Sequence, residues 1–214
     1  KAVRLAVDRQ ELVDTVMGGE AVVSCDTPVA PTDQYRHNMR CRQNIAEAKK
    51  LLKEAEYPNG IEMVIHVSTI EPTWPTIAEV IQQQVAKAGI KVDIKMTPSK
   101  SYWKETWMKK DVAMTRWNER SADSVLHEVY HSSAKWNESY YKSSDFDKNL
   151  ADARGELDFK KRKALYVKAQ HTLWEQSGTM IPYHVSKLVV TNSRVKNLDE
   201  VEVFSIQWHK VKVD

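Results

Sequence analysis

The sequence predicts an α/β fold in which a mixed sheet is flanked by helices. Two alternating segments, 61–67 and 90–96, enclose a helical pattern over 73–88. The whole unit takes about 35 residues, a spacing typical of a right-handed strand–helix–strand crossover. A length of 214 residues with 42% hydrophobic residues suits one large domain or two small ones with a real core.

The N-terminal part is expected to hold three helices and one long loop. The helices are predicted at Lys1–Val7, Arg9–Met17 and Ile45–Ala55. Gly18 and Gly19 end the second helix, and Asn44 is placed to cap the third. Residues 20–43 are rich in Thr, Pro and Asp and contain both cysteines, which favours an irregular loop.

The central part carries the predicted sheet. After a turn at 58–60, strands are expected at Ile61–Val67 and Ile90–Met96, on either side of a helix at Thr73–Ala88. A further helix from Pro98 to about Lys109 and a buried strand at Val112–Trp117 complete the unit.

The C-terminal part begins with two helices, near Phe146–Glu156 and Asp158–Gln176. Short strands are expected at Met180–Val185 and Leu188–Thr191. The tail Val201–Val213 alternates weakly and is expected to pair with an element that lies outside this chain.

Composition excludes several classes of function. The chain has 32 basic and 29 acidic residues, and its lysine clusters are interleaved with acids, so no nucleic-acid partner is expected. No apolar run reaches the length of a membrane-spanning helix, and six glycines argue against a Gly-rich phosphate loop. The spacing of Cys25 and Cys41 suits a disulfide in an exported protein, whereas in a cytosolic protein they would be two unrelated thiols.

Several segments occur in the order typical of one family. They are Ala2–Arg9, Ile45–Ala55, Val80–Gln84, Ala88–Val92, and Asp111-Val112 followed by Trp117. Together they resemble the C-terminal part of the extracytoplasmic solute-binding proteins of ABC importers, family 5, the peptide/nickel-binding type. The resemblance implies a lobe of a type II periplasmic-binding-protein-like fold.

The resemblance also implies a domain organisation and a biological setting. Residues 1–200 would form the second ligand-binding lobe, and residues 201–214 a tail that crosses back towards an absent first lobe. The chain starts at Lys1 within a helical pattern, so a piece of a longer protein is expected. The implied function is binding of a peptide or peptide-like solute without catalysis or a cofactor, and delivery to ABC permease subunits. The implied location is periplasmic or extracytoplasmic, with lipid anchoring through the absent N-terminus as an option.

Aromatic and amide side chains supply the candidate solute site. A binding cleft needs flat apolar walls and a few fixed polar groups. The candidates are Trp103, Trp117, Asn118, Arg120, Asp123, Trp136 and Asn137. For each tryptophan, packing in the core is the alternative interpretation.

Arg120 constrains the charge of the solute. Peptide binders of the family often carry Asp three residues after the tryptophan that corresponds to Trp117, where it pairs with an ammonium group. Arg120 stands there instead and favours a carboxylate or phosphate, so we expect a solute that is anionic or neutral at that end. Asp123 and Glu119 remain possible acids for the solute, and Asp123 is also placed to cap the next helix.

A competing motif points to an enzyme. The sequence His127-Glu128-Val129-Tyr130-His131 matches the zinc-protease pattern H-E-x-x-H. Ser132 and Ser133 follow directly, and no third His follows at the spacing of the metzincins. Glu156 is the only acid placed as a third ligand, and its helix already has a counterpart in the solute-binding family. The alternative function is therefore a zinc metallohydrolase, and the simpler interpretation is two solvated histidines on a short exposed helix. No resident metal is expected.

Overall fold

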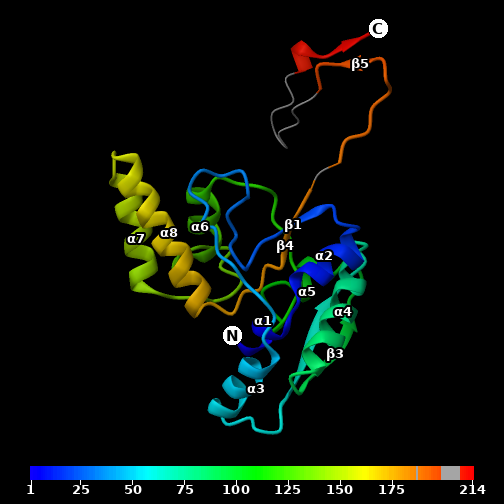
Figure 1. The fold of residues 1–214 in the computed structure, drawn as a ribbon, viewed down its shortest axis with the longest axis vertical. Helices are drawn as coiled ribbons and strands as arrows, with labels where there is room; N and C mark the ends of the chain where they lie inside the picture. The colour runs from blue at the N-terminus through cyan, green and yellow to red at the C-terminus, as the bar shows by residue number, and fades with distance from the viewer. Residues whose placement is uncertain (187, 199–207) are drawn as a thin grey trace. The chain divides into compact units, whose positions relative to one another are not determined.

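A computed structural model describes residues 1–186, 188–198 and 208–214 of the chain (Figure 1). Contacts divide the chain into two compact units, Lys1–His184 and Val185–Asp214. The predicted lobe boundary at residue 200 lies outside the described residues. Among the described helices, none has the length and apolar character needed to cross a membrane.

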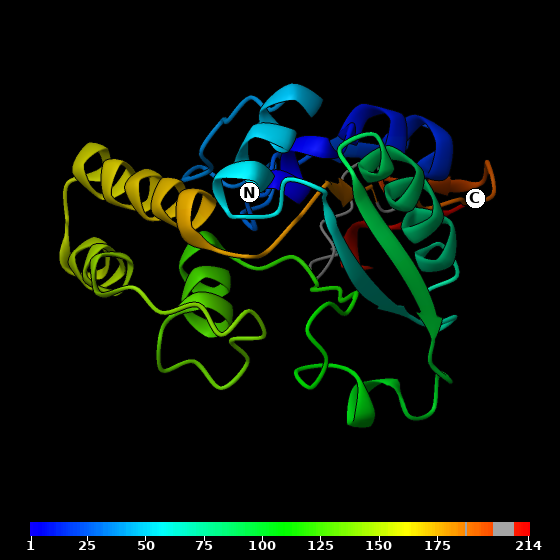
Figure 2. The same ribbon diagram turned by 90° about the horizontal axis from the view of Figure 1, so that it is seen from below.

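The centre of the first unit is the predicted strand–helix–strand crossover. Strands β2 (Ile61–Val67) and β3 (Ile90–Met96) pair in parallel, from Ile61 opposite Ile90 to Val67 opposite Met96. Helix α4 (Trp74–Ala86) lies along one face of this pair (Figure 2). Its buried residues Ile77, Ile81 and Val85 belong to the same core as the strands.

The start of the parallel pair depends on a close contact between two glycines. Gly60 has a φ of +88°, and a Cβ built on it would lie 1.9 Å from the carbonyl oxygen of Gly89. Ile61 N donates a hydrogen bond to that same oxygen at 3.2 Å. The turn at 58–60 therefore needs a residue without a side chain at position 60.

Two expectations for the segment after β3 are wrong. The predicted helix to Lys109 is reduced to α5 (Tyr102–Glu105), and Met108 adopts a left-handed φ of 55° that no continuing helix allows. Within residues 112–117, all described, the predicted strand contributes one parallel bridge, between Ala113 and His66. The chain leaves the sheet after Met114 N has bonded to His66 O, so no ladder forms.

The N-terminal helices follow the prediction. They are α1 (Ala2–Ala6), α2 (Arg9–Met17) and α3 (Ile45–Glu54). Asn44 caps α3 through the amide of Glu47, as predicted, and Asp8 caps α2. The loop 20–43 is less irregular than expected, because it contains strand β1 (Ala21–Val23), which pairs with β4 (Tyr183–Val185). The predicted disulfide between Cys25 and Cys41 is present.

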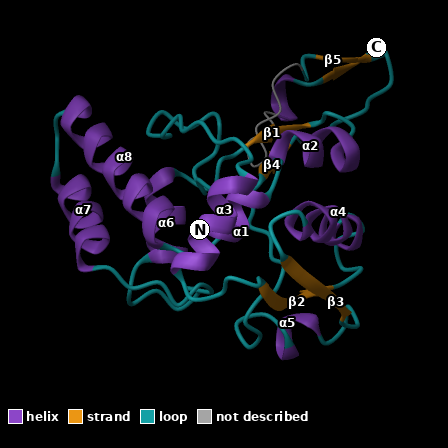
Figure 3. Cartoon of the chain, turned by 60° about the horizontal axis from the view of Figure 1, so that its bottom comes forward, coloured by secondary structure: helices purple, strands orange, loops and turns teal. Residues whose placement is uncertain are grey.

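Three helices build a second core in the first unit. They are α6 (Ala122–Tyr130), α7 (Ser144–Gly155) and α8 (Phe159–Gln176), of which α7 and α8 lie side by side (Figures 1 and 3). Phe146, Leu150 and Leu173 are among its fully buried side chains. The predicted helix ranges are confirmed to within two residues.

The C-terminal unit departs from the prediction. Residues 188–191, expected as a strand, have no regular structure. Strand β6 (Lys212–Val213) pairs antiparallel with β5 (Val195–Lys196). Within the described part of the tail, Lys212 and Val213 therefore pair inside this chain, and the expectation of an outside partner for the tail stays a prediction. Most of the predicted tail strand, 201–207, lies outside the described residues.

Candidate functional site

Six aromatic side chains form one continuous row, here called the aromatic row. Its members, in order, are Trp74, Tyr102, Trp103, Trp107, Trp117 and Trp136, and the ring centroids of successive members lie 5.4–6.4 Å apart. The rings come from the start of α4, from α5 and the turn after it, and from the loops before and after α6. The structure thus brings the three tryptophans predicted for the site, Trp103, Trp117 and Trp136, into one row.

The row passes from the core to the surface. Trp74 is 6% exposed and belongs to the core, whereas Trp103 and Trp136 are 37% and 38% exposed. Edge-to-face and tilted ring pairs of this kind contribute about 0.5–1.5 kcal/mol each beyond the area that they bury. The row therefore reaches the surface at two places, Trp103 and Trp136.

Glu138 holds two neighbouring rings of the row in place. Its carboxylate oxygens accept hydrogen bonds from the indole Nε1 of Trp107 at 2.5 Å and of Trp117 at 3.1 Å. Burial raises the pKa of Glu138, although these hydrogen bonds act in the opposite direction. Sequence reasoning missed this role. The available signal was a single acid in an aromatic-rich stretch, after Trp136 and Asn137.

The two asparagines predicted for the site differ in their surroundings. Asn137 is buried, and its amide bonds to both the N–H and the carbonyl of Tyr141, at 3.1 and 2.5 Å. Its side chain closes the loop that carries Trp136 and Glu138. Asn118 is exposed, and its backbone carbonyl accepts a hydrogen bond from Arg120 Nη1 at 3.4 Å.

Arg120 lies at the exposed side of Trp117. The guanidinium carbon is 5.2 Å from the Trp117 ring centroid, a cation–π contact, and Nε donates to Glu128 Oε2 at 3.0 Å. Ser124 Oγ donates to the other oxygen of Glu128 at 2.7 Å, and this bond, followed by that from Arg120, lowers the pKa of Glu128. The side chain of Arg120 stays 27% exposed, so part of its guanidinium faces solvent.

Asp123 does not cap α6, contrary to the expectation. Ser121 caps the helix by accepting from Ser124 N, and Asp123 lies in the first turn. Its carboxylate accepts two hydrogen bonds of 2.8 Å and one of 3.1 Å from Arg154, and another of 3.0 Å from Tyr166. The bonds from Arg154 lower the pKa of Asp123. Asp123 thereby ties α6 to α7 and α8.

The H-E-x-x-H segment lacks the arrangement of a zinc protease. Helix α6 ends at Tyr130, and His131 is already its extended C-cap, although the two imidazole rings lie 4.6 Å apart. Glu128 is held by Arg120 and Ser124. Among the residues that the structure describes, no three His, Cys, Asp or Glu side chains gather as a metal site. The helix is also not simply exposed, because one face lies in the second core.

Comparison with known proteins gives one consistent family. Residues 1–137 match the model for bacterial extracellular solute-binding proteins, family 5 Middle. The chain is 30% identical over 207 residues to the glutathione-binding protein GsiB of Salmonella choleraesuis, covering 91% of this chain and 40% of that protein. GsiB of Escherichia coli K12 is 29% identical over 208 residues, with the same coverage.

Solved structures agree with this result. The periplasmic binding protein DppA of Helicobacter pylori, in complex with the peptide STSA, aligns with a TM-score of 0.78 and 28% identity. The alignment covers 99% of this chain and 43% of DppA. HbpA2 of Haemophilus parasuis aligns with a TM-score of 0.75 and 26% identity, over 86% of this chain and 38% of HbpA2.

The shared fold is that of a type II periplasmic binding protein, as predicted. The chain spans about two fifths of the length of the curated relatives that it matches. None of the described geometry favours the metallohydrolase alternative, and the relatives named above are binding proteins. The chain belongs to the bacterial extracellular solute-binding proteins of family 5.

Proposed function

We propose that this chain is the second ligand-binding lobe of a solute receptor that delivers a peptide or peptide-like solute to an ABC permease. The observation that carries this proposal is the aromatic row, with exposed faces at Trp103 and Trp136, in a chain of this family. In this proposal residues 1–200 form the lobe and residues 201–214 cross back towards the first lobe. The protein binds and releases the solute and performs no chemistry.

The row supplies apolar walls, and its surroundings supply hydrogen bonds. Trp117 presents a ring fixed by Glu138, and Trp136 lies 5.8 Å from it. Asn118 contributes an exposed amide. Asn137 does not contact the solute in this proposal. It holds the loop that carries Trp136 and Glu138, because both ends of its amide bond to Tyr141. A rigid, pre-ordered wall of this kind reduces the entropy lost on binding.

We further propose that the cleft prefers a solute with an anionic or neutral polar group near Arg120. The partly exposed guanidinium has one acidic partner, Glu128, whose side chain is itself 40% exposed. An exposed pair of this kind is weak, so a solute carboxylate competes with Glu128 for the guanidinium. Asp123 is engaged by Arg154 and Tyr166, which leaves it less suited to receive an ammonium group.

A binding screen tests the solute class. Tryptophan fluorescence and calorimetry would follow titration of the chain, and of the complete receptor, with glutathione, dipeptides, short peptides, sugars and nickel chelates. Glutathione and peptides are included because GsiB is a glutathione-binding protein and the DppA structure contains the peptide STSA. Saturable binding of a peptide-like solute, weaker in the isolated lobe, is expected, since a one-sided site leaves polar groups half-paired. Saturable binding of sugars alone would contradict the proposal.

Variants at position 120 test the charge preference. Arg120→Ala is expected to weaken binding of an anionic peptide about tenfold, the value of one charge-assisted hydrogen bond. Arg116→Ala is the matched control, because Arg116 lies on the same segment and pairs with Glu71. Tight binding of cationic, free-amine peptides that Arg120→Ala leaves unchanged would refute the charge argument.

The proposed location is extracytoplasmic, and the proposed partners are the permease subunits and the first lobe. A disulfide in the structure supports an oxidising compartment. Lipid anchoring remains part of the proposal. Fractionation of cells, with and without globomycin-type inhibition of lipoprotein processing, distinguishes an anchored receptor from a freely diffusing one.

A further inference from the structure

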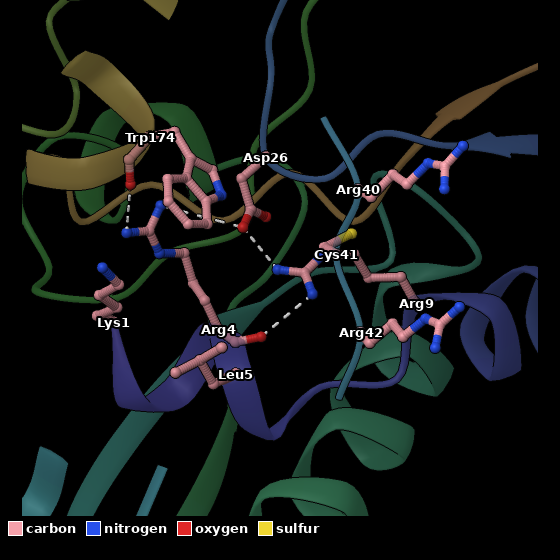
Figure 4. Close-up of a pocket in the computed structure, with 9 residues that line it drawn as sticks. All are labelled: Lys1, Arg4, Leu5, Arg9, Asp26, Arg40, Cys41, Arg42 and Trp174. Carbon is pink, nitrogen blue, oxygen red and sulfur yellow. Dashed lines mark hydrogen bonds and ion pairs between the residues drawn. The ribbon is translucent and has the colours of Figure 1, made fainter. Parts of the chain in front are cut away.

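A cavity of about 190 Å³ lies between α1, the disulfide loop and the end of α8 (Figure 4). Its lining includes Arg4 and Arg9 from the N-terminal helices, Asp26 beside the disulfide, and Trp174. No residue of the aromatic row belongs to this lining, so the cavity is separate from the candidate solute site.

Two buried guanidinium groups share one carboxylate in this cavity. The side chains of Arg4 and Arg9 are 7% and 4% exposed, and that of Asp26 is 1% exposed. Arg9 Nη2 donates to Asp26 Oδ2 at 2.6 Å, while Arg4 Nη1 lies 4.0 Å from the same oxygen. The other oxygen of Asp26 accepts from Ile181 N at 2.9 Å.

One guanidinium nitrogen of Arg4, on the side of Asp26, makes no hydrogen bond within the described part of the chain. Arg4 Nη2 donates to the carbonyl of Trp174 at 2.6 Å, and the guanidinium lies 5.9 Å from the Trp174 ring centroid (Figure 4). Its Nη1 is buried and, within the described part of the chain, has no hydrogen-bond partner. A buried donor that makes no hydrogen bond costs free energy, and a ligand oxygen that accepts from Arg4 Nη1 would recover that cost.

The charge around the cavity is positive. Asp26 offsets one of the two buried cations, and burial raises its pKa against the opposing effect of Arg9 and Arg4. Lys1 is paired with Glu175 at 2.8 Å. Exposed Arg40 and Arg42 add further positive charge, although Figure 4 shows their guanidinium groups pointing away from Asp26.

We infer that this cavity is a binding site for one small oxyanion of the carboxylate or phosphate type, held by Arg4 Nη1 beside Trp174. A guanidinium with a free N–H is the usual partner of such oxygens. The volume is below the roughly 300–1,000 Å³ typical of sites for whole drug-sized ligands, so it suits one anionic group. The site is additional to solute capture by the aromatic row.

Anion titration of the chain tests the inference. The midpoint of thermal unfolding is measured against sodium phosphate, sulfate and acetate, with sodium chloride at matched ionic strength as the reference. An oxyanion that binds the folded state raises the midpoint along a saturable curve, which chloride does not reproduce. Preference for phosphate and sulfate over acetate identifies a tetrahedral anion, and the reverse identifies a carboxylate.

Variants locate the effect. Arg4→Lys keeps the charge but removes the forked donor, so the apparent affinity is expected to fall about tenfold. Arg36→Lys is the matched control, because Arg36 is a partly buried guanidinium outside the cavity that donates to Val29 O. If Arg4→Lys does not fold, the guanidinium resonances of the unmodified chain serve instead, and phosphate must shift those of Arg4.

Two results would overturn the inference. One is an equal response to chloride and to all three oxyanions. The other is saturable binding that Arg4→Lys leaves unchanged, or that leaves the Arg4 resonances unmoved. Neither result bears on the proposed receptor function, because the titration contains no peptide and changes no residue of the aromatic row.

Discussion

Removal of the Cys25–Cys41 bridge should destabilise the chain mainly through its unfolded state. The two residues are 16 positions apart, and the chain-entropy relation gives about 3 kcal/mol for closing a loop of this length. The bridge also fixes Cys25 and Asp26, which have left-handed φ values of 56° and 65°. Because about 2–4 °C corresponds to 1 kcal/mol in a chain of this size, Cys25→Ala/Cys41→Ala should lower the unfolding midpoint by about 6–12 °C.

Four samples decide whether the bridge has this effect. The unmodified chain and the double variant are each unfolded with and without a reductant, and mass spectrometry records the gain of two hydrogens on reduction. The oxidised unmodified chain should be the most stable, and the other three should agree. A double variant as stable as the oxidised chain, or equally sensitive to reductant, would refute the reasoning.

Three further predictions concern the cores and the row. Phe146→Ala should lower the free energy of unfolding in urea by about 3–5 kcal/mol, since Phe146 is fully buried; a loss below about 1 kcal/mol would mean that the helical core is not packed as described. Gly60→Ala should cost more than about 2 kcal/mol because its Cβ meets Gly89 O, whereas Gly178→Ala, with open space around it, is the control and should be near neutral. For Glu138 the folded-state pKa is raised above its ordinary 4.5, so the folded state binds the proton more tightly and stability falls as pH rises through that window. Glu138→Gln should therefore gain stability relative to the unmodified chain between pH 4.5 and the raised pKa, and a pH-independent difference in urea unfolding would contradict this.

Regular local patterns predicted the elements that build the crossover. The alternation over Ile61–Val67 and Ile90–Met96, and the helical spacing of Ile77, Ile81 and Val85, were sufficient because each pattern matches one buried face. The segment 112–117 is equally apolar, but its pairing depends on a register with His66 that local sequence does not encode. The result is one bridge in place of a strand.

The site shows the same division between local and long-range information. Composition and resemblance selected Trp103, Trp117 and Trp136, which the structure brings into one row. The hydrogen bond from Trp107 to Glu138 depends on a loop that brings Glu138 to an indole 31 residues earlier in the sequence. The local sequence favours Asp123 as a helix cap, whereas its bond to Arg154, also over 31 residues, is not encoded in the local pattern. That Trp103, Trp117 and Trp136 contact the solute remains a prediction.

The pairing of β1 with β4 has a consequence for biosynthesis. His184 lies in β4 and Thr27 follows β1, and His184 Nε2 and Thr27 O are 3.1 Å apart in space although the two residues are 157 positions apart in sequence. A ribosome adds roughly 5–20 residues per second, so the early strand waits many seconds for its partner to be made. Throughout that interval β1 has no partner strand to pair with. The β1–β4 pair can therefore close only after the helices and strands between these two segments have been made.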